Sequence, residues 1–357
     1  MNITVNREAL VYALDLLVKI IPKAHMNIVF TGVEITAQNE HLMIRGCDES
    51  GGMIINIEAQ IDEPGKIIVK HSTLMGLVKN FSDETVTLNV NENKLEVREG
   101  KSKYLLGLYD TNSYISMPDI PEDGWNTIHE SGDALRNCSI VFRMSESGSF
   151  MRTHQQVFYN VYCDGEHMMA VAPDATRLSV VSINTPQNII IPSALVEHIK
   201  GSSTIDVADN ERMVFIKTSN GLYYAIKTCN EYPAHTVLGL MNHNANTTIT
   251  IERVAVIEAI NRLRQICQTG TIKITDELIT ITSTYGGHKG VEEIPCQLEG
   301  AEQECHITLS YMSEALQACA SDTVKWQLDS RREGYPPTQY IYDNNKTHIF
   351  MSRLKDS

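Results

Sequence analysis

The sequence has no long apolar segment and no secretion signal. None of its 357 residues lie in a run that approaches the roughly 20 apolar residues of a membrane-spanning helix. The N-terminus reads MNITVNREAL, with Arg7 and Glu8 inside it, and lacks the apolar core of a signal peptide. Hydrophobic residues make up 42% of the chain, which is enough for sizeable buried cores. We therefore expect a globular protein that stays in the cytoplasm.

Paired cysteines are also lacking. No two of the eight cysteines form a Cys-x-x-Cys pair, and all of them are spread through apolar segments. This distribution is typical of reduced thiols in a protein core, and it argues against a zinc site or a disulfide framework. We expect neither at these cysteines, which are Cys47, Cys138, Cys163, Cys229, Cys267, Cys296, Cys305 and Cys319.

Basic residues are fewer than acidic ones. The chain has 30 Lys and Arg against 44 Asp and Glu, a formal net charge of -14 at pH 7. A simple nucleic-acid binder owes its affinity to a basic surface, so this balance argues against that class. It does not exclude a protein that gathers its basic residues on one face.

Motifs of common enzymes are absent as well. The sequence contains no His-Glu-x-x-His, Gly-x-Ser-x-Gly or Gly-x-Gly-x-x-Gly pattern. Gly100-Lys101-Ser102 is similar to the end of a phosphate-binding loop, but position 95 is Leu and a predicted strand follows, so we predict a hairpin turn. We therefore expect no catalysis, no cofactor and no metal. An enzyme whose catalytic groups meet only in the folded chain remains the alternative.

One pattern of elements occurs three times in the chain. A short β-branched strand leads into a polar or Pro start signal, one short helix, a polar break and a second alternating strand. Val86, Ile205 and Val324 hold equivalent places in the second strands and are 119 residues apart in both steps. The three copies are GKIIVKHSTLMGLVKNFSDETVTLNV from Gly65, QNIIIPSALVEHIKGSSTIDVA from Gln187 and CHITLSYMSEALQACASDTVKWQL from Cys305.

A further strand and helix precede each copy, beginning near the N-terminus, at Asn126 and at Thr247. Spacing typical of a helix places apolar residues on one stripe in the first and third of these helices. The stripes are Leu10, Leu14, Leu17, Val18 and Ile21 in the first helix and Val256, Ile260, Leu263 and Cys267 in the third.

These repeats predict the domain organisation. A helix with one apolar face has to lie on a sheet, so the fold class is α+β with helices on one face of antiparallel sheets. We expect three tandem domains, each with two strand–helix–strands units, over residues 1–122, 123–244 and 245–357. The predicted linkers lie near Ser116–Gly124 and Leu240–Thr247.

Two features of the repeated units invite a functional interpretation. The stretch AVAPDATRLSVVSI, Ala170 to Ile183, places a polar turn with Thr176 and Arg177 between two apolar strands. Basic residues also recur on the polar faces of the predicted helices, although acidic residues share these faces and a solvated surface explains them equally well. The basic residues are Arg7, Lys19, Lys23, Arg136, Arg143, Arg253, Arg262 and Arg264.

Several local motifs then follow one another in an order that is familiar. They are TVNREAL, ENKLEVREGKSKYLLGLYD and ISMPDIP in the first domain, DGEHMMAVAPDATRLSVV, IIIPSALVEHI and EYPAHTVL in the second, and IFMSRL in the third. In this order and spacing the whole chain resembles the bacterial-type DNA polymerase sliding clamps, the β subunits of the replicative DNA polymerase III. The resemblance does not distinguish a chromosomal from a viral member.

The resemblance implies a homodimer, a ring of two head-to-tail chains with helices lining a hole for duplex DNA. DNA contacts would go to phosphates without sequence readout. A repeat scaffold without any role on nucleic acid remains a second alternative. The residues implied for DNA binding are Lys19, Lys23, Arg136, Arg143, Arg152, His154 and Gln155, and those for the dimer interface are Lys103, Tyr104, Leu106, Ile266 and Cys267.

The resemblance also implies a hydrophobic pocket for short extended peptides of the replicative polymerase, the clamp loader and other clamp-binding proteins. Two departures from the family pattern fall on it. Pro173–Leu178 replaces the usual Thr-Asp-Gly-His-Arg-Leu, and Ser352 with three extra C-terminal residues replaces the usual ending. The implied pocket residues are Asp174, Ala175, Thr176, Arg177, Leu178, Pro233, Tyr311, Phe350, Met351, Ser352 and Arg353.

Overall fold

The computed structural model describes the chain except residues 39, 143–156, 229–230, 242–244, 331–335 and 352–357. The described residues form two compact units. The first unit is Met1–Asn126 with Ile205–Ile226, and the second unit is Thr127–Thr204 with Lys227–Ser357. Within the described residues, no helix has the length and apolar character needed to cross a membrane.

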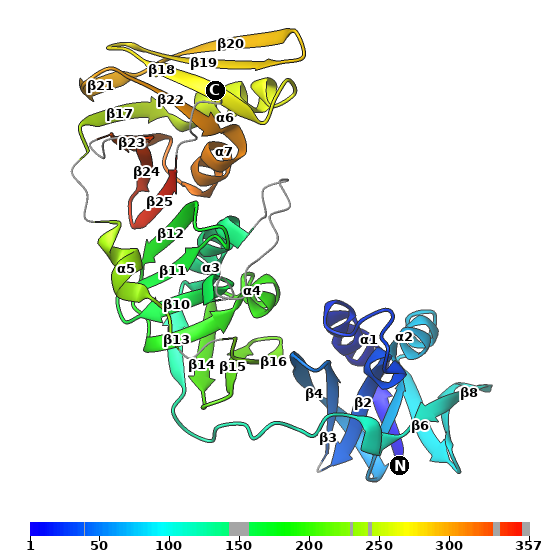
Figure 1. Ribbon diagram of the computed structural model, residues 1–357. Helices are drawn as coiled ribbons and strands as arrows, with labels where there is room; N and C mark the ends of the chain where they lie inside the picture. The colour runs from blue at the N-terminus through cyan, green and yellow to red at the C-terminus, as the bar shows by residue number, and fades with distance from the viewer. Residues whose placement is uncertain (39, 143–156, 229–230, 242–244, 331–335, 352–357) are drawn as a thin grey trace. The chain divides into compact units, whose positions relative to one another are not determined.

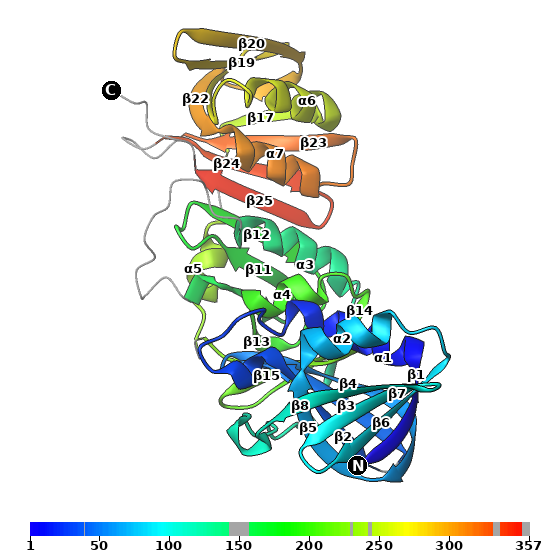
Figure 2. The ribbon, with the colours of Figure 1, turned by 90° about the vertical axis from the view of Figure 1, so that its right-hand side faces the viewer.

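The first unit is built on one antiparallel sheet. Its strand order is β1-β6-β7-β8-β5-β2-β3-β4-β16-β15-β14, and β1 also pairs with β4, so the strands of its N-terminal part close on themselves. Helices α1 and α2 lie side by side against these strands (Figure 2). The elements are β1 (Asn2–Asn6), α1 (Arg7–Leu16), η1 (Leu17–Lys19), η2 (Ile28–Thr31), β2 (Gly32–Gln38), β3 (His41–Cys47), β4 (Gly51–Glu63), β5 (Gly65–Lys70), α2 (His71–Lys79), β6 (Thr85–Asn91), β7 (Lys94–Glu99), β8 (Ser102–Tyr109), η3 (Thr111–Ser113), β14 (Thr204–Asp209), β15 (Met213–Thr218) and β16 (Gly221–Ile226).

The second unit is built on two antiparallel sheets (Figure 1). Their strand orders are β13-β10-β11-β12-β25-β24-β23-β17-β21 and β20-β19-β18-β22. The elements are β9 (Asn126–His129), α3 (Ser131–Ser139), η4 (Ile140–Phe142), β10 (Asn160–Asp164), β11 (His167–Val171), β12 (Arg177–Ser182), β13 (Gln187–Pro192), α4 (Ser193–Ile199), α5 (Ala234–Gly239), β17 (Thr247–Glu252), α6 (Arg253–Leu263), β18 (Thr269–Ile274), β19 (Leu278–Tyr285), β20 (His288–Pro295), β21 (Gln297–Gly300), β22 (Gln303–Thr308), α7 (Leu309–Ala318), β23 (Thr323–Asp329), β24 (Thr338–Asp343) and β25 (Lys346–Met351).

The predicted repeats are confirmed as repeats of secondary structure. In the threefold pattern, β5, β13 and β22 each run into a helix, and β6, β14 and β23 follow as the second strands. Val86, Ile205 and Val324 are each the second residue of their strand, and all are buried. The predicted turn after β7 is also confirmed, with Gly100 at a φ of 52° between two paired strands.

The apolar stripe of the first helix is confirmed except at Val18. Leu10, Leu14 and Leu17 are fully buried, but the side chain of Val18 is 44% exposed. Helix α1 begins after Asn6, whose side chain accepts a hydrogen bond from the Ala9 amide at 3.0 Å, and it ends at Leu16. A 3₁₀ turn follows, so the spacing of 3.6 residues per turn no longer applies at Val18.

The division into three domains remains a prediction. Strands β14 to β16 group with the N-terminal residues because β16 pairs with β4, with Leu222 opposite Ile54 and Ala225 opposite Gly51. This pairing brings the two backbones very close. A Cβ atom at Gly51 would lie 2.4 Å from the Tyr224 carbonyl oxygen, so only glycine fits there.

Most described cysteines lie in the core, as predicted. Cys47, Cys138, Cys163, Cys305 and Cys319 are buried, while Cys267 and Cys296 are half-buried. Burial raises the pKa of the Cys163 thiol to about 12, which keeps it protonated and unreactive near neutral pH. Over the described residues, no group of three or more His, Cys, Asp or Glu side chains is arranged to hold a metal ion.

Candidate functional site

The turn between β11 and β12 has the conformation that its sequence predicts. The Asp174 carboxylate accepts hydrogen bonds from the Thr176 amide at 3.1 Å and from the Thr176 hydroxyl at 2.7 Å. The Ala175 amide donates to the Ala172 carbonyl at 2.8 Å. Ala175 has a φ of 58°, in the left-handed region that favours glycine. The turn is therefore well bonded but carries backbone strain at one residue.

We expect Ala175→Gly to raise the free energy of unfolding of the second unit by about 1 kcal/mol, because glycine adopts a positive φ without strain. Urea unfolding followed by intrinsic fluorescence measures the change. The matched control is Ala172→Gly, at a buried position of the same turn whose φ is not positive, and it should lower stability. A loss of stability in Ala175→Gly would contradict the assigned strain.

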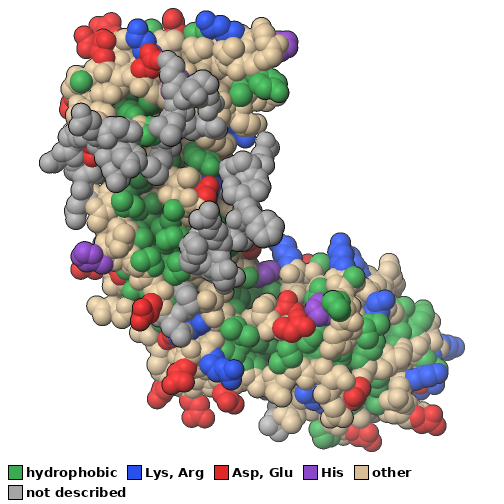
Figure 3. Space-filling model, in the orientation of Figure 1, with side chains coloured by type: hydrophobic (Ala, Val, Ile, Leu, Met, Phe, Trp, Pro, Cys, Tyr) green, Lys and Arg blue, Asp and Glu red, His purple; other side chains and the backbone are tan. Residues whose placement is uncertain are grey.

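Leu178 faces an apolar cluster on one face of the nine-stranded sheet. We call this cluster the apolar face. Figure 3 shows hydrophobic side chains gathered over β10 to β12. Tyr232 stacks on Tyr162 with ring centroids 4.8 Å apart, and α5 packs beside them through Val237. Pro233 is exposed between Tyr232 and α5. The buried residues of the apolar face are Tyr162, Met169, Val171, Leu178, Val180, Ile190, Val237, Tyr340 and Ile349, and Phe158, Tyr232, Ala234, Leu238, Met241 and Tyr342 pack against them partly exposed.

Arg177 points to the opposite face, because successive strand residues alternate. Its side chain is 6% exposed and forms an ion pair with Glu314 of α7 at 2.7 Å. The guanidinium carbon lies 4.2 Å from the centroid of the Tyr311 ring. The guanidinium also donates hydrogen bonds to the carbonyls of Ile140 and Val141, at 3.4 and 3.3 Å. One buried cation therefore ties β12 to η4 and α7.

The structure does not bring all predicted pocket residues onto one surface. Leu178 and Pro233 lie at the apolar face, whereas Arg177, Tyr311 and Phe350 lie on the helix side of the sheet. Phe350, opposite Arg177 in the strand pairing, is 2% exposed within the core around α6 and α7. Strand alternation is the physical reason, since Ile349 takes the place at the apolar face. Met351 ends β25, and Ser352 and Arg353 lie outside the described residues.

A second buried cation, Lys346, makes the reverse connection, from β25 to α3. Strands β12 and β25 pair antiparallel from Arg177 opposite Phe350 to Val181 opposite Lys346; we call this pairing the seam. Lys346 of β25 is 7% exposed and reaches Asp133 of α3 at 2.9 Å. Arg177 thus reaches from β12 to α7 while Lys346 reaches from β25 to α3. Each of these two ion pairs joins residues more than one hundred positions apart in the sequence. Local sequence motifs therefore could not predict them.

Comparison with known proteins shows what this chain is similar to. Residues 1–118 match the family model described as DNA polymerase III beta subunit, N-terminal domain. The beta sliding clamp of Bacillus subtilis is 25% identical over 350 residues, covering 88% of this chain and 90% of that protein. The beta sliding clamp of Staphylococcus aureus is 24% identical over 352 residues, covering 91% and 92%.

Solved structures agree over the full length. The crystal structure of the Bacillus subtilis DNA polymerase sliding clamp matches with a TM-score of 0.87 at 19% identity, over 100% of both chains. That of the Pseudomonas aeruginosa DNA polymerase III subunit beta also gives 0.87, at 17% identity, over 99% of this chain and 100% of the other. Residues 1–118 therefore match the N-terminal domain of that family, and the whole chain has the fold of the solved sliding clamps. The predicted sliding-clamp fold is confirmed.

The described residues among those implied for DNA binding come from both units. Lys19 of η1 and Lys23 are exposed, and so is Arg136 of α3. Arg136 donates to the Lys200 carbonyl at 3.0 Å and lies 3.7 Å from Asp133. Arg143, Arg152, His154 and Gln155 fall outside the described residues.

Two other basic residues of the helix faces are engaged elsewhere. The Nε and Nη2 atoms of Arg262 each donate to one oxygen of the Glu292 carboxylate on β20, both at 2.8 Å. These hydrogen bonds hold the pKa of Glu292 below its ordinary value. Arg253 donates to the Ser321 carbonyl at 2.8 Å. These two side chains therefore serve the packing of the second unit.

The residues implied for a dimer interface lie on β8 and in the segment between α6 and β18. Lys103, Tyr104 and Leu106 belong to β8, which pairs with β7 along its length but with β5 only at Leu108 and Tyr109. Tyr104 is 39% exposed and lies over Phe81 with ring centroids 5.6 Å apart. Lys103 forms an ion pair with Glu96. The first part of β8 therefore offers an open edge among the described strand pairings.

The second edge, β20, was not identified from the sequence. It pairs only with β19 among the described strands, and its residue Val291 is 50% exposed. Ile266 lies against it, since a Cβ atom at Gly290 would meet the Ile266 Cδ1 atom at 2.7 Å. Cys267 is half-buried beside Ile266. The signal was available as the alternating strand LITITSTY followed by the Gly286-Gly287 turn.

Proposed function

We propose that the protein is a DNA sliding clamp, a ring of two head-to-tail chains that encircles duplex DNA and tethers the replicative polymerase and other DNA-processing proteins. The observation that carries this proposal is that the likeness in both sequence and fold extends over nearly the whole chain. The protein then acts by its topology and holds no catalytic site.

The proposed DNA-facing residues are Lys19, Lys23 and Arg136, together with Arg143, Arg152, His154 and Gln155. Contacts of this kind go to phosphates, so they weaken steeply as salt rises and carry no sequence preference. A weakly attractive lining is sufficient when the ring cannot leave the duplex sideways. It also explains how a chain of net charge -14 serves DNA.

Retention on circular DNA tests the function directly. The protein is loaded by its clamp loader onto nicked circular DNA and then filtered at a salt concentration that removes electrostatic binders. We expect it to stay with circular DNA and to be lost when the DNA is linearised. Equal loss from circular and linear DNA would exclude a topological clamp, and a simple scaffold would not be retained on either.

We expect wild-type protein to have the mass of two chains in light scattering and Ile266→Asp to have the mass of one. In the proposed interface, the open edge of β8 meets β20 and Ile266 of the other chain, a heterologous contact that closes by two-fold symmetry. A buried aspartate there would lack a partner. The matched control is Val254→Asp, an exposed position of α6 that should remain dimeric. A monomeric wild-type protein at micromolar concentration would refute the ring.

We expect a labelled Gln-Leu-x-Leu-Phe-type peptide to bind the apolar face with about micromolar affinity. Two or three buried large apolar side chains contribute roughly 1.5–3 kcal/mol each, less the ordering of a flexible peptide. Fluorescence polarisation should show at least tenfold weaker binding to Leu238→Asp, because Leu238 packs at the rim of the apolar face. Leu240→Asp, exposed just after α5, is the control. Equal binding to both variants would place the peptide site elsewhere.

A further inference from the structure

Strand β13, the first strand in the order of the nine-stranded sheet, contains a bulge at one exposed asparagine. The register of β10 against β13 shifts between Cys163 and Asp164, and in the described pairing of these strands Asn188 has no opposite residue. Asn188 has a φ of 60°, in the left-handed region that asparagine tolerates better than most residues. A bulge of this kind redirects a side chain out of the regular alternation of the strand.

The redirected side chain of Asn188 orients one tyrosine ring of the apolar face. Its Oδ1 atom accepts a hydrogen bond from the Tyr162 hydroxyl at 2.7 Å. Burial raises the pKa of Tyr162, so its hydroxyl stays protonated and donates near neutral pH. Tyr162 is 7% exposed among apolar side chains, whose contacts have no preferred direction. The hydrogen bond is directional and therefore sets the tilt of the ring.

The Tyr162 ring in turn holds the segment that leads into α5. It stacks on Tyr232 with an interplanar angle of 4°, and Phe158 meets Tyr232 edge-on with ring centroids 6.3 Å apart. Aromatic pairs favour both arrangements. Tyr232 precedes Pro233, whose carbonyl accepts the Val237 amide of α5 at 3.1 Å. A change in the tilt of Tyr162 is therefore passed on to Pro233 and α5.

Helix α5 depends on such contacts for its position. It has six residues, Ala234–Gly239, and a helix of this length is not stable without tertiary contacts. Ala234, Val237 and Leu238 pack within the apolar face, next to Tyr232. The aromatic stack thus stands beside the first residue of a helix that forms part of the proposed peptide-binding surface.

We propose that Asn188 is a positioning residue, which orients Tyr162 and through it holds Tyr232, Pro233 and α5 in the arrangement that receives a partner peptide. The effect on the peptide rests on the proposed function, whereas the effect on α5 does not. Asn188 lies outside the residues that the resemblance implies for the pocket. Its role accounts for a residue with positive φ at an exposed position of a strand, because strain of this kind persists where the structure uses it.

Hydrogen exchange of the α5 amides, measured without peptide, tests the positioning. We expect exchange about threefold to tenfold faster in Asn188→Gly than in the wild type, because glycine keeps the positive φ but offers Tyr162 no side-chain acceptor. Tyr162→Phe should give a similar increase. The double variant should exchange no faster than either single variant, since each removes the same contact. Asn188→Asp keeps an acceptor oxygen and should stay within about twofold of the wild type.

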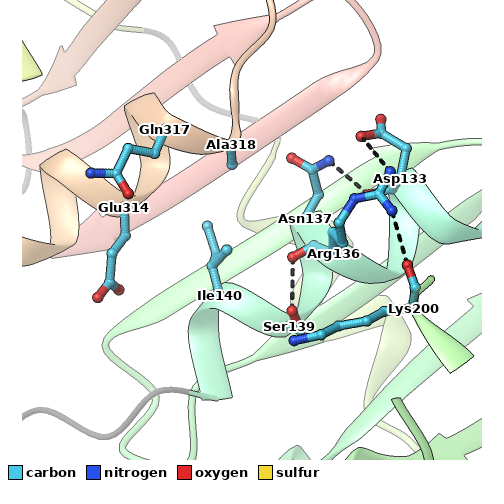
Figure 4. A pocket seen from close by; sticks show the side chains of 9 residues that line it. All are labelled: Asp133, Arg136, Asn137, Ser139, Ile140, Lys200, Glu314, Gln317 and Ala318. Atoms are coloured by element: carbon cyan, nitrogen blue, oxygen red, sulfur yellow. Dashed lines mark hydrogen bonds and ion pairs between the residues drawn. The ribbon is translucent and has the colours of Figure 1, made fainter. Parts of the chain in front are cut away.

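Fluorescence polarisation with the labelled peptide measures the effect on binding. Asn188→Gly and Tyr162→Phe should each bind about threefold to tenfold more weakly than the wild type, and Asn188→Asp within about twofold. The matched control is Asn344→Gly, because Asn344 also has a positive φ, of 53°, but donates to Asp343 and Ser321. A second control is Gln317→Ala, on the helix side of the sheet (Figure 4). Both controls should bind and exchange like the wild type.

The two measurements separate this inference from the proposed function. If the wild type bound no peptide while α5 exchanged faster in Asn188→Gly, the peptide site would be refuted and the positioning by Asn188 supported. Unchanged exchange of α5 in Asn188→Gly would overturn the proposal, and so would additive effects in the double variant. An equal effect of Asn344→Gly, or an equal loss of protection in β10 to β12, would also overturn it, because either would indicate a general loss of stability.

Discussion

Replacing Arg45 by methionine is expected to lower the free energy of unfolding of the first unit by about 3–5 kcal/mol. The Arg45 side chain is fully buried and lies 3.1 Å from Glu34, whose side chain is 1% exposed. The same guanidinium donates to the Ile115 carbonyl and lies over the Tyr114 ring, with its carbon 5.0 Å from the centroid. Loss of the cation leaves the buried Glu34 carboxylate with only the partly exposed Lys66 as an ionic partner, and it takes the donor away from the Ile115 carbonyl.

A double variant separates the charge effect from the loss of packing. Glu34→Leu combined with Arg45→Met removes both charges, and it should recover most of the lost stability because apolar side chains of similar volume fill the space. Lys66, the other partner of Glu34 at 2.7 Å, is 46% exposed and returns to water. Urea unfolding with hydrogen exchange of the β2 and β3 amides measures both variants. If Arg45→Met lowered the free energy of unfolding by less than about 1 kcal/mol, the buried ion pair between Arg45 and Glu34 would be contradicted.

Acidification from pH 7 to pH 4.5 is expected to lower the free energy of unfolding of the second unit by about 2 kcal/mol through His348 alone. His348 lies on the seam opposite Ser179 and is 2% exposed. Burial, and to a smaller extent the neighbouring Lys346 charge, lowers its pKa to about 4. The unfolded chain, with a pKa of about 6.5, therefore binds a proton in this window that the folded chain does not bind.

The diagnostic is the slope of stability against pH. Stability should fall as pH drops below about 6.5 and should flatten with respect to His348 below about 4. His348→Gln removes this titration, so its slope between these limits should be smaller than that of wild type, whatever its stability at pH 7. Fluorescence of the buried Trp326 in a Trp125→Phe background reports the second unit. Identical slopes in the two proteins would contradict the assignment to His348.

Local patterns in the sequence predicted what depends on neighbours along the chain. The strand-to-helix steps, the Gly100 turn and the buried places of Val86, Ile205 and Val324 follow from periodicity and turn residues that act over a few positions. Periodicity failed at Val18 because the helix tightens to a 3₁₀ turn there, a change that apolar spacing alone does not encode.

The parts that were not predicted depend on residues far apart in the sequence. Arg45 reaches Ile115, and Arg177 reaches Glu314, across separations that contain no regular spacing. The side chain of Leu178 lies on the opposite face of the sheet from those of Arg177 and Phe350, and this likewise follows from the register of β12 against β25. A motif names the residues near a site, but the pairing register decides which face of the sheet each side chain occupies.

The seam also has a consequence for the order in which the protein is made. Strand β12 ends at Ser182, and its partner β25 begins at Lys346. A ribosome adding 5–20 residues per second needs roughly 10–30 seconds to cover that interval. For this time the nascent chain presents β12 with one unpaired edge, beside the apolar side chains of Leu178 and Val180. Such an edge is a template for pairing with other chains, so we expect the nascent chain to be most prone to association before β25 has been made.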